Sequence, residues 1–225
     1  LPLTTAADGI ALVGLLATAR VFLALAAMDV GTAFGTLGAR REMMLGFLAE
    51  PALLMVIFVA AMISQTTSLP MIAEHLTGEE MALYPSLAFT AVAFTLVLLA
   101  ENARIPIDNP ATHLELTMIH EAMLLEYSAR HLALMEWGAA LKLFNYACIG
   151  LTLFVPFGVA TEAQGPLGLL LAVPVLGIKL LVAGAALAVL ETVSAKLRVF
   201  RAPEFLATAF LFAVLGLLVH LLLGA

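Results

Sequence analysis

Six apolar stretches, each long enough to cross a lipid bilayer, dominate this sequence of 225 residues. The hydrocarbon core of a bilayer is about 30 Å thick, and a helix needs about 20 residues to cross it. In lipid, only helices and closed barrels satisfy their own backbone hydrogen bonds. We therefore predict an all-α, polytopic membrane helix bundle that forms one membrane domain over residues 1–225. The predicted spans are residues 6–28, 43–63, 83–101, 131–158, 167–191 and 203–223.

The composition agrees with this prediction and excludes several other classes of protein. Hydrophobic residues make up 63% of the chain and charged residues 12%, whereas soluble domains are about half apolar and about a quarter charged. A net charge of −6 without a basic patch argues against a nucleic-acid partner. The single cysteine, Cys148, excludes an intrachain disulfide and a self-contained iron–sulfur cluster. The apolar sequence after Ala6 has no basic segment or cleavage site, so we expect it to be a membrane span and not a signal peptide.

The basic residues predict how the chain lies in the membrane, because Lys and Arg concentrate in cytoplasmic connectors. Seven of them lie in alternate predicted connectors, and the other connectors have none. We therefore expect residues 29–42, 102–130 and 192–202 to face the cytoplasm, with both termini on the outer side of the cell (inner or plasma) membrane. The seven residues are Arg40, Arg41, Arg104, Arg130, Lys196, Arg198 and Arg201.

Several ionisable residues lie inside or at the edges of the predicted spans. A charge in hydrocarbon costs about 2.5–3.5 kcal/mol on insertion scales, so it usually faces the bundle interior, water or an opposite charge. Residues near a span end can instead extend the charged group to the surface, and for Arg20, Asp29 and Glu136 both interpretations stay open. For Glu50, Lys179 and Glu191 together we favour a functional interior role. The complete set is Arg20, Asp29, Glu50, Glu101, Glu136, Lys142, Lys179 and Glu191.

The connector over residues 102–130 is polar and rich in acids. Two prolines keep its start out of regular helix, and Thr112 followed by Glu115 is typical of a helix start. Glu115 and Glu126 are eleven residues apart, about three helical turns, so we expect both carboxylates on one helix face. His113 and His120 would share a face too. A metal at the two histidines needs further ligands, so a solvated or hydrogen-bonded pair is the better interpretation.

Several motifs resemble a known family. The pattern Glu101-Asn102-x-Arg104-x-Pro106-x-Asp108-x-Pro110 resembles the signature loop of subunit 1 of respiratory complex I. The segments Arg40-Arg41-Glu42, Ala49-Glu50-Pro51 (where a glutamate opens a span) and Glu126-Tyr127-Ser128 are similar to other parts of that family. Residues 112–123 (THLELTMIHEAM) and 196–204 (KLRVFRAPE) more closely resemble the homologous membrane subunit of energy-converting nickel–iron hydrogenases, including formate hydrogenlyase.

This resemblance implies a membrane-anchoring and energy-coupling subunit that links a hydrophilic redox arm to proton or sodium translocation. It implies no cofactor or metal in this chain, with nickel–iron and iron–sulfur centres in partner subunits. The implied partners are the hydrogenase large subunit, iron–sulfur subunits and antiporter-like membrane subunits. Because the family has about eight helices, we expect its N-terminal helices to be missing from this sequence. The expected coupling path contains Glu50, Glu101, Asp108, Glu115, Glu121, Glu126 and Glu191. The expected supporting charges are Arg20, Asp29, Arg40, Arg41, Arg104 and Lys179.

Two other functions stay open at this point. The first is the quinone-site subunit 1 of a complex I-type NADH dehydrogenase. The sequence of residues 112–123 is the feature that distinguishes the hydrogenase branch from this alternative. The second is an unrelated transporter or channel. Transporters often contain internal repeats and helices broken near the midplane. We find no clear case of either in this sequence.

Overall fold

The computed structural model describes residues 7–78, 84–108, 118–159, 165–195, 197 and 201–223. Within these residues the secondary structure is helical, and five helices are long and apolar enough to cross a membrane. The helix α4 is shorter but also apolar. The predicted all-α membrane bundle is therefore confirmed. The helices are α1 (Gly9–Asp29), α2 (Ala33–Ser64), α3 (Leu69–Gly78), α4 (Pro85–Glu101), α5 (His120–Leu124), α6 (Ala129–Phe154), α7 (Gly165–Val193) and α8 (Ala202–Leu223).

Local signals set the ends of these helices. The side chain of Asp8 caps α1 by accepting hydrogen bonds from the backbone N–H groups of Ile10 and Ala11, at 2.9 and 3.0 Å. Thr32 caps α2 in the same way through the N–H of Gly35. These bonds satisfy backbone donors that the first turn of a helix leaves without partners.

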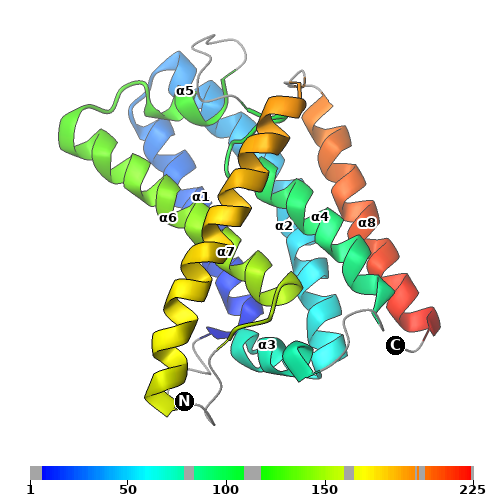
Figure 1. The fold of residues 1–225 in the computed structure, drawn as a ribbon. Coiled ribbons are helices and arrows are strands. Elements are labelled where there is room, and N and C mark those ends of the chain that lie inside the picture. The colour runs from blue at the N-terminus through cyan, green and yellow to red at the C-terminus, as the bar shows by residue number, and fades with distance from the viewer. Residues whose placement is uncertain are drawn as a thin grey trace.

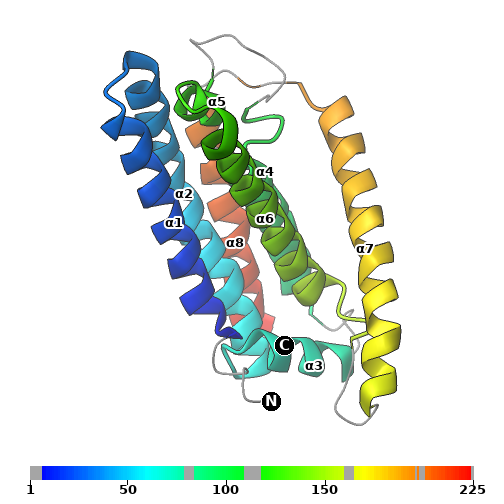
Figure 2. The ribbon, with the colours of Figure 1, turned by 90° about the vertical axis from the view of Figure 1, so that its left-hand side faces the viewer.

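The helix α2 lies at the centre of the bundle and packs against α1, α4 and α8. Leu53, Val56 and Ile57 of α2 are almost completely buried in the core, together with Phe94 of α4 and Leu206 of α8. By contrast, α7 stands apart from the other helices in Figure 2, and no residue in its most apolar 18-residue stretch is buried. The principal packing neighbour of α7 is α6.

The ends of the helices divide into two groups (Figure 1). The start of α1, the end of α8 and the short helix α3 lie at one end of the bundle, and α5 lies at the other. The chain reaches the α5 end after α1, after α4 and after α7, and these are the predicted connectors that carry basic residues. The arrangement agrees with the predicted alternation, and the cytoplasmic side of the membrane stays a prediction.

Two predictions about helix boundaries are wrong. The predicted connector 29–42 shrinks to residues 30–32, because α2 begins at Ala33 and continues as one helix through the apolar stretch. Arg40 and Arg41 therefore lie on α2, and Glu50 lies in its middle instead of at the start of a span. The early start of α2 is stabilised by packing: the buried Gly38 faces the backbone oxygen of Ile119 and the side chain of Ala122.

The second error concerns the connector after α4. We expected one helix face to carry both Glu115 and Glu126. The structure instead has a short helix, α5, which starts at His120 and ends at Leu124, and Met118 and Ile119 before it are not helical. Glu126 therefore lies beyond the end of this helix, while Glu115 and His113 lie outside the described residues. The irregular segment at Ile119 is held by Asp108, as described below.

Candidate functional site

Arg20 of α1 is a buried arginine that is bound by three carboxylates. Arg20 is only 5% exposed, and its side chain points toward α2 and α4. The Nη1 atom donates a hydrogen bond to Oε1 of Glu50 at 2.9 Å, and Nε lies 3.6 Å from Oε1 of Glu42. The Nη2 atom pairs with Oε1 of Glu101, the last residue of α4. The guanidinium group suits this position because it presents several donors in a fixed plane.

A glycine in α2 makes room for this arginine. A Cβ atom at Gly46 would lie 2.0 Å from Nη1 of Arg20, and 2.9 Å from its Cδ and Cζ atoms. Such distances are shorter than any real Cβ contact, so only glycine lets the guanidinium pass this close to the helix backbone. Gly46 lies between Glu42 and Glu50, one helical turn from each, which places all three on the same side of α2.

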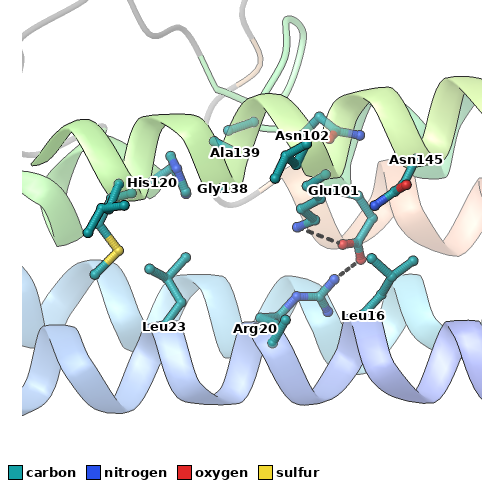
Figure 3. Close-up of a pocket in the computed structure, with 15 residues that line it drawn as sticks. Leu16, Arg20, Leu23, Glu101, Asn102, His120, Gly138, Ala139 and Asn145 are labelled. Carbon is teal, nitrogen blue, oxygen red and sulfur yellow. Dashed lines mark ion pairs between the residues drawn. The ribbon is translucent and has the colours of Figure 1, made fainter. Parts of the chain in front are cut away.

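Lys142 of α6 completes the cluster from the other side. Its Nζ atom lies 3.0 Å from Oε2 of Glu101, whose side chain is 1% exposed. Glu101 therefore bridges two cations from different helices, Arg20 on α1 and Lys142 on α6 (Figure 3). We call this group of five residues the Arg20 cluster: Arg20, Glu42, Glu50, Glu101 and Lys142.

A cavity of about 340 Å³ lies between α1 and α6 beside the cluster (Figure 3). Its walls are partly apolar, with Leu16 and Leu23 on α1 and Leu134 and Leu141 on α6. Arg20, Glu101 and Lys142 are among its lining residues. In Figure 3, His120 lies on the opposite side of the cavity from the Arg20–Glu101 pair. The buried Oδ1 atom of Asn102 makes no hydrogen bond within the described part of the chain, and Nε of Arg20 and Oε2 of Glu101 have only their ion-pair contacts with Glu42 and Lys142. Buried polar atoms of this kind are normally satisfied by water.

A second group of charges surrounds the connector after α4. Asp108 is buried, and its Oδ2 atom accepts hydrogen bonds from the backbone N–H groups of Ile119 and His120, both at 3.1 Å. These bonds fix the start of α5. Next to them is a smaller cavity of about 140 Å³, which Asp108, Glu121 and Arg104 line together with His120. Arg104 also pairs with Glu191 near the end of α7, with Nη1 3.6 Å from Oε1.

Lys179 and Arg41 interact with backbone carbonyls. The Nζ atom of Lys179 donates to the carbonyl oxygens of Val155, at 2.6 Å, and of Phe157, and it lies 4.3 Å from the centre of the Phe157 ring. These contacts attach the middle of α7 to the end of α6. Arg41 donates from Nη1 to the carbonyl oxygen of Met118 at 2.8 Å. Each cation therefore joins two chain segments, and neither is one of the five residues of the Arg20 cluster.

The predicted site residues thus separate into distinct places. The structure brings Glu50 and Glu101 together around Arg20, it places Asp108 and Glu121 at the smaller cavity, and it pairs Glu191 with Arg104. Among the other predicted residues, Glu115 lies outside the described residues, and Lys179 and Arg41 bind carbonyls. The remaining predicted site residues, Asp29, Arg40 and Glu126, are exposed in the structure. Glu136, one of the ionisable residues noted in the predicted spans, is also exposed.

Three residues of the site were missing from the predicted path. Glu42 was noted only in a motif, because it was placed in a connector and not on α2. Once α2 is known to begin at Ala33, its spacing of eight residues from Glu50 puts both on one helix face. Lys142 was noted as a charge within a span, but nothing in the sequence connects it with Glu101. His120 was considered only for a pair with His113, and its position at both cavities is visible only in the structure.

No group of three or more metal-binding side chains occurs among the residues that the structure describes.

Comparison with known proteins identifies the family. A family model described as NADH dehydrogenase matches residues 2–222, nearly the whole chain. The chain belongs to this family. It is 39% identical over 162 residues to hydrogenase-4 component C of Escherichia coli (strain K12), covering 72% of this chain and 50% of that protein. It is 33% identical over 216 residues to formate hydrogenlyase subunit 4 of the same organism, covering 96% of this chain and 69% of that protein.

These comparisons confirm the resemblance to the complex I subunit 1 family and to its hydrogenase branch. The chain spans half the length of one of these relatives and about two thirds of the other. Together with the apolar helices, the family makes this chain a multi-pass membrane protein.

Proposed function

We propose that this chain is the membrane-anchoring and energy-coupling subunit of a membrane-bound hydrogenase or formate hydrogenlyase complex in the cell membrane. Two relatives with these names support the proposal. In this proposal the nickel–iron and iron–sulfur centres belong to partner subunits of a hydrophilic arm, and antiporter-like subunits adjoin this chain in the membrane. The chain itself contributes charged groups that bind and release protons, or that respond to a coupled ion.

The Arg20 cluster is the observation that carries this proposal. When all its groups are ionised, three carboxylates face two cations, so the cluster has one excess negative charge. An unbalanced charge inside a membrane protein is costly, and binding one proton removes it. The excess carboxylate favours the bound proton, while the two cations favour its release. Uptake or loss of one proton would therefore change the net charge of the cluster between zero and one negative charge, which is the kind of change that a coupling site uses.

The position of the cluster also supports the proposal. Its members come from α1, α2, α4 and α6, so a change in its charge acts on four helices at once. The adjoining cavity extends from the cluster toward His120 and the α5 end of the bundle. By the distribution of basic residues, we predict that this end faces the cytoplasm, where a redox arm would dock.

Substitution of the buried carboxylate tests the proposal. The variant Glu101→Gln keeps the shape of the side chain but cannot bind or release a proton. In the assembled complex in liposomes, we expect ion uptake per electron to fall at least about tenfold while the redox subunits stay attached and active with an artificial donor. Glu136→Gln, an exposed position on α6, is the matched control and should behave like the wild type.

Two results would contradict the proposal. If Glu101→Gln and the corresponding variants of Glu42 and Glu50 all couple normally, the path lies elsewhere. If the complex dissociates in these variants, the carboxylates serve docking and not coupling.

The alternative function, a quinone-site subunit, is favoured by one observation. The larger cavity has apolar walls and a polar end, and its volume of about 340 Å³ is within the range of sites for small organic ligands. A photoreactive quinone analogue should label α1 or α6 of the complex if this alternative is correct. If the chain instead has the hydrogenase function, labelling should not exceed the nonspecific background, which is measured in the presence of excess unlabelled quinone.

A further inference from the structure

His120 lies at the junction of the two cavities of the site. The larger cavity contains Glu101 of the Arg20 cluster, and the smaller one contains Asp108 and Glu121. Four residues line both cavities: Asn102, Ala103, His120 and Ala139. Of these four, His120 alone has an ionisable side chain, an imidazole with two nitrogens that can each hold a proton. The larger cavity thus runs from His120 to the Arg20–Glu101 pair (Figure 3).

We propose that His120 transfers protons between the two cavities, and so connects the α5 end of the bundle with Glu101. This inference rests on the proposed coupling function and adds a proton-transfer residue to it. A carboxylic acid or a water of the smaller cavity gives a proton to one ring nitrogen, which forms an imidazolium. The imidazolium then releases the proton of its other nitrogen into the larger cavity, toward the carboxylate of Glu101. The neutral ring then turns, so that its protonated nitrogen faces the larger cavity and its free nitrogen faces the smaller one, and no other reactant is needed.

The spaces on both sides of His120 are large enough for water. A cavity needs about 10–15 Å³ to hold one water, so the larger cavity of about 340 Å³ and the smaller of about 140 Å³ each have room for several. The buried Oδ1 atom of Asn102, which makes no hydrogen bond within the described residues, and the Oε2 atom of Glu101, which pairs with Lys142, provide polar contacts for such waters. Water can therefore bridge the distance between the imidazole and Glu101.

Charged groups from every neighbouring element influence a proton on His120. On the side of the larger cavity, the cations Arg20 and Lys142 oppose a positive imidazolium, and Glu101 stabilises it. On the side of the smaller cavity, Arg104 opposes it, and Asp108 and Glu121 stabilise it. The charged residues around α5 are Arg20 from α1, Arg41 and Glu42 from α2, Glu101 from α4, Arg104 and Asp108 from the connector, Glu121 from α5 and Lys142 from α6.

The contact that fixes the start of α5 uses the backbone N–H of His120, which donates to Asp108. A glutamine at position 120 keeps this N–H and a polar side chain. The variant His120→Gln should therefore fold and assemble, while it removes the group that carries the proton.

The test uses His120→Gln in the complete complex, reconstituted in liposomes. We expect ion uptake per electron to fall at least about tenfold, with electron transfer to an artificial acceptor unchanged. Free imidazole, added at millimolar concentration, should restore part of the lost uptake, because it can enter the cavity and carry the proton. A merely structural role of His120 would not respond to imidazole. The control is His131→Gln, an exposed histidine in the first turn of α6, which should have no effect.

The comparison with Glu101→Gln separates this inference from the function on which it rests. If Glu101→Gln abolishes coupling and His120→Gln couples like the wild type, His120 transfers no proton and the inference is refuted alone. If His120→Gln loses coupling but imidazole restores nothing, the role is structural and the inference is likewise refuted. If neither variant affects coupling, the inference is refuted, and the proposed function fails with it when the variants of Glu42 and Glu50 also couple normally.

Discussion

Replacing Gly46 by alanine tests whether close packing of α2 holds Arg20 among its carboxylates. The new Cβ atom would lie 2.0 Å from Nη1 of Arg20, so the guanidinium would have to move by more than an ångström. A shift of that size would break the 2.9 Å hydrogen bond to Glu50 and disturb the pair with Glu101.

The expected magnitude follows from three contributions to the free energy of unfolding. Overpacking of a closed interior costs about 1–3 kcal/mol. Loss of one partner from a buried ion pair costs about 3–5 kcal/mol. A displaced Arg20 keeps some of its contacts, so only a part of that cost applies here. Alanine in place of glycine in a helix returns about 0.5–1 kcal/mol. We therefore expect Gly46→Ala to destabilise the protein by about 2 kcal/mol.

The measurement is equilibrium unfolding of the purified chain in mixed micelles, titrated with sodium dodecyl sulfate. Gly14→Ala in α1 and Gly138→Ala in α6 are matched controls, since a Cβ at either position meets nothing within 4 Å. Both should be as stable as the wild type or slightly more stable. In the background Arg20→Ala, which removes the three crowded atoms, Gly46→Ala should cost nothing. If Gly46→Ala is as stable as the controls, or destabilises equally without Arg20, the packing argument is wrong.

Three further predictions concern other parts of the chain. Hydrogen bonds from the Thr67 hydroxyl and from backbone N–H groups lower the pKa of Asp8. The ionised side chain therefore stabilises the fold at neutral pH, and this stabilisation is lost as the pH falls below the ordinary carboxyl pKa. The free energy of unfolding of Asp8→Asn should accordingly be lower than that of the wild type at neutral pH and should approach it in acid. In a Cys148→Ser background, Glu126→Cys should react with an impermeant thiol reagent from the cytoplasmic side and Glu74→Cys from the outer side, and the opposite result would reverse the topology. Lys179→Met should loosen α7 from α6, and amide hydrogen exchange in the segment around Val155 should rise, whereas unchanged exchange would show that apolar packing alone holds α7.

Hydrophobicity allowed the membrane spans to be predicted, because an apolar stretch of this length lies in lipid whichever other helices it packs against. It could not locate the start of α2, since that helix begins ten residues before the predicted span, in a segment that contains Arg40, Arg41 and Glu42 and that packs against α5 through Gly38. Glu42 was therefore lost from the predicted path. The end of α4 was predicted correctly at Glu101, where the apolar stretch and the helix stop together.

The roles of the charged residues depend on neighbours that are distant in the sequence. The sequence left open whether Arg20 extends to the membrane surface or faces the interior, and its three carboxylate partners on α2 and α4 decide for the interior. For Lys179 an interior functional role was favoured, but its ammonium group binds two backbone carbonyls at the end of α6. Backbone groups carry no signal of this kind in the sequence, so such a contact could not be predicted.

Glu101 is the point at which a change in charge would act on the largest part of the fold. Its two oxygens separate the cations Arg20 and Lys142, which belong to the helices on either side of the larger cavity. When Glu101 takes up a proton, both attractions weaken and the two cations repel each other, so α1 and α6 should move apart. The variant Glu101→Gln imitates the neutral state. Spin labels at the exposed positions Phe22 and Trp137 should report a longer and broader distance in this variant, measured by pulsed electron paramagnetic resonance. An unchanged distance would mean that the cluster absorbs the proton without moving its helices, and coupling would then have to act through charge alone.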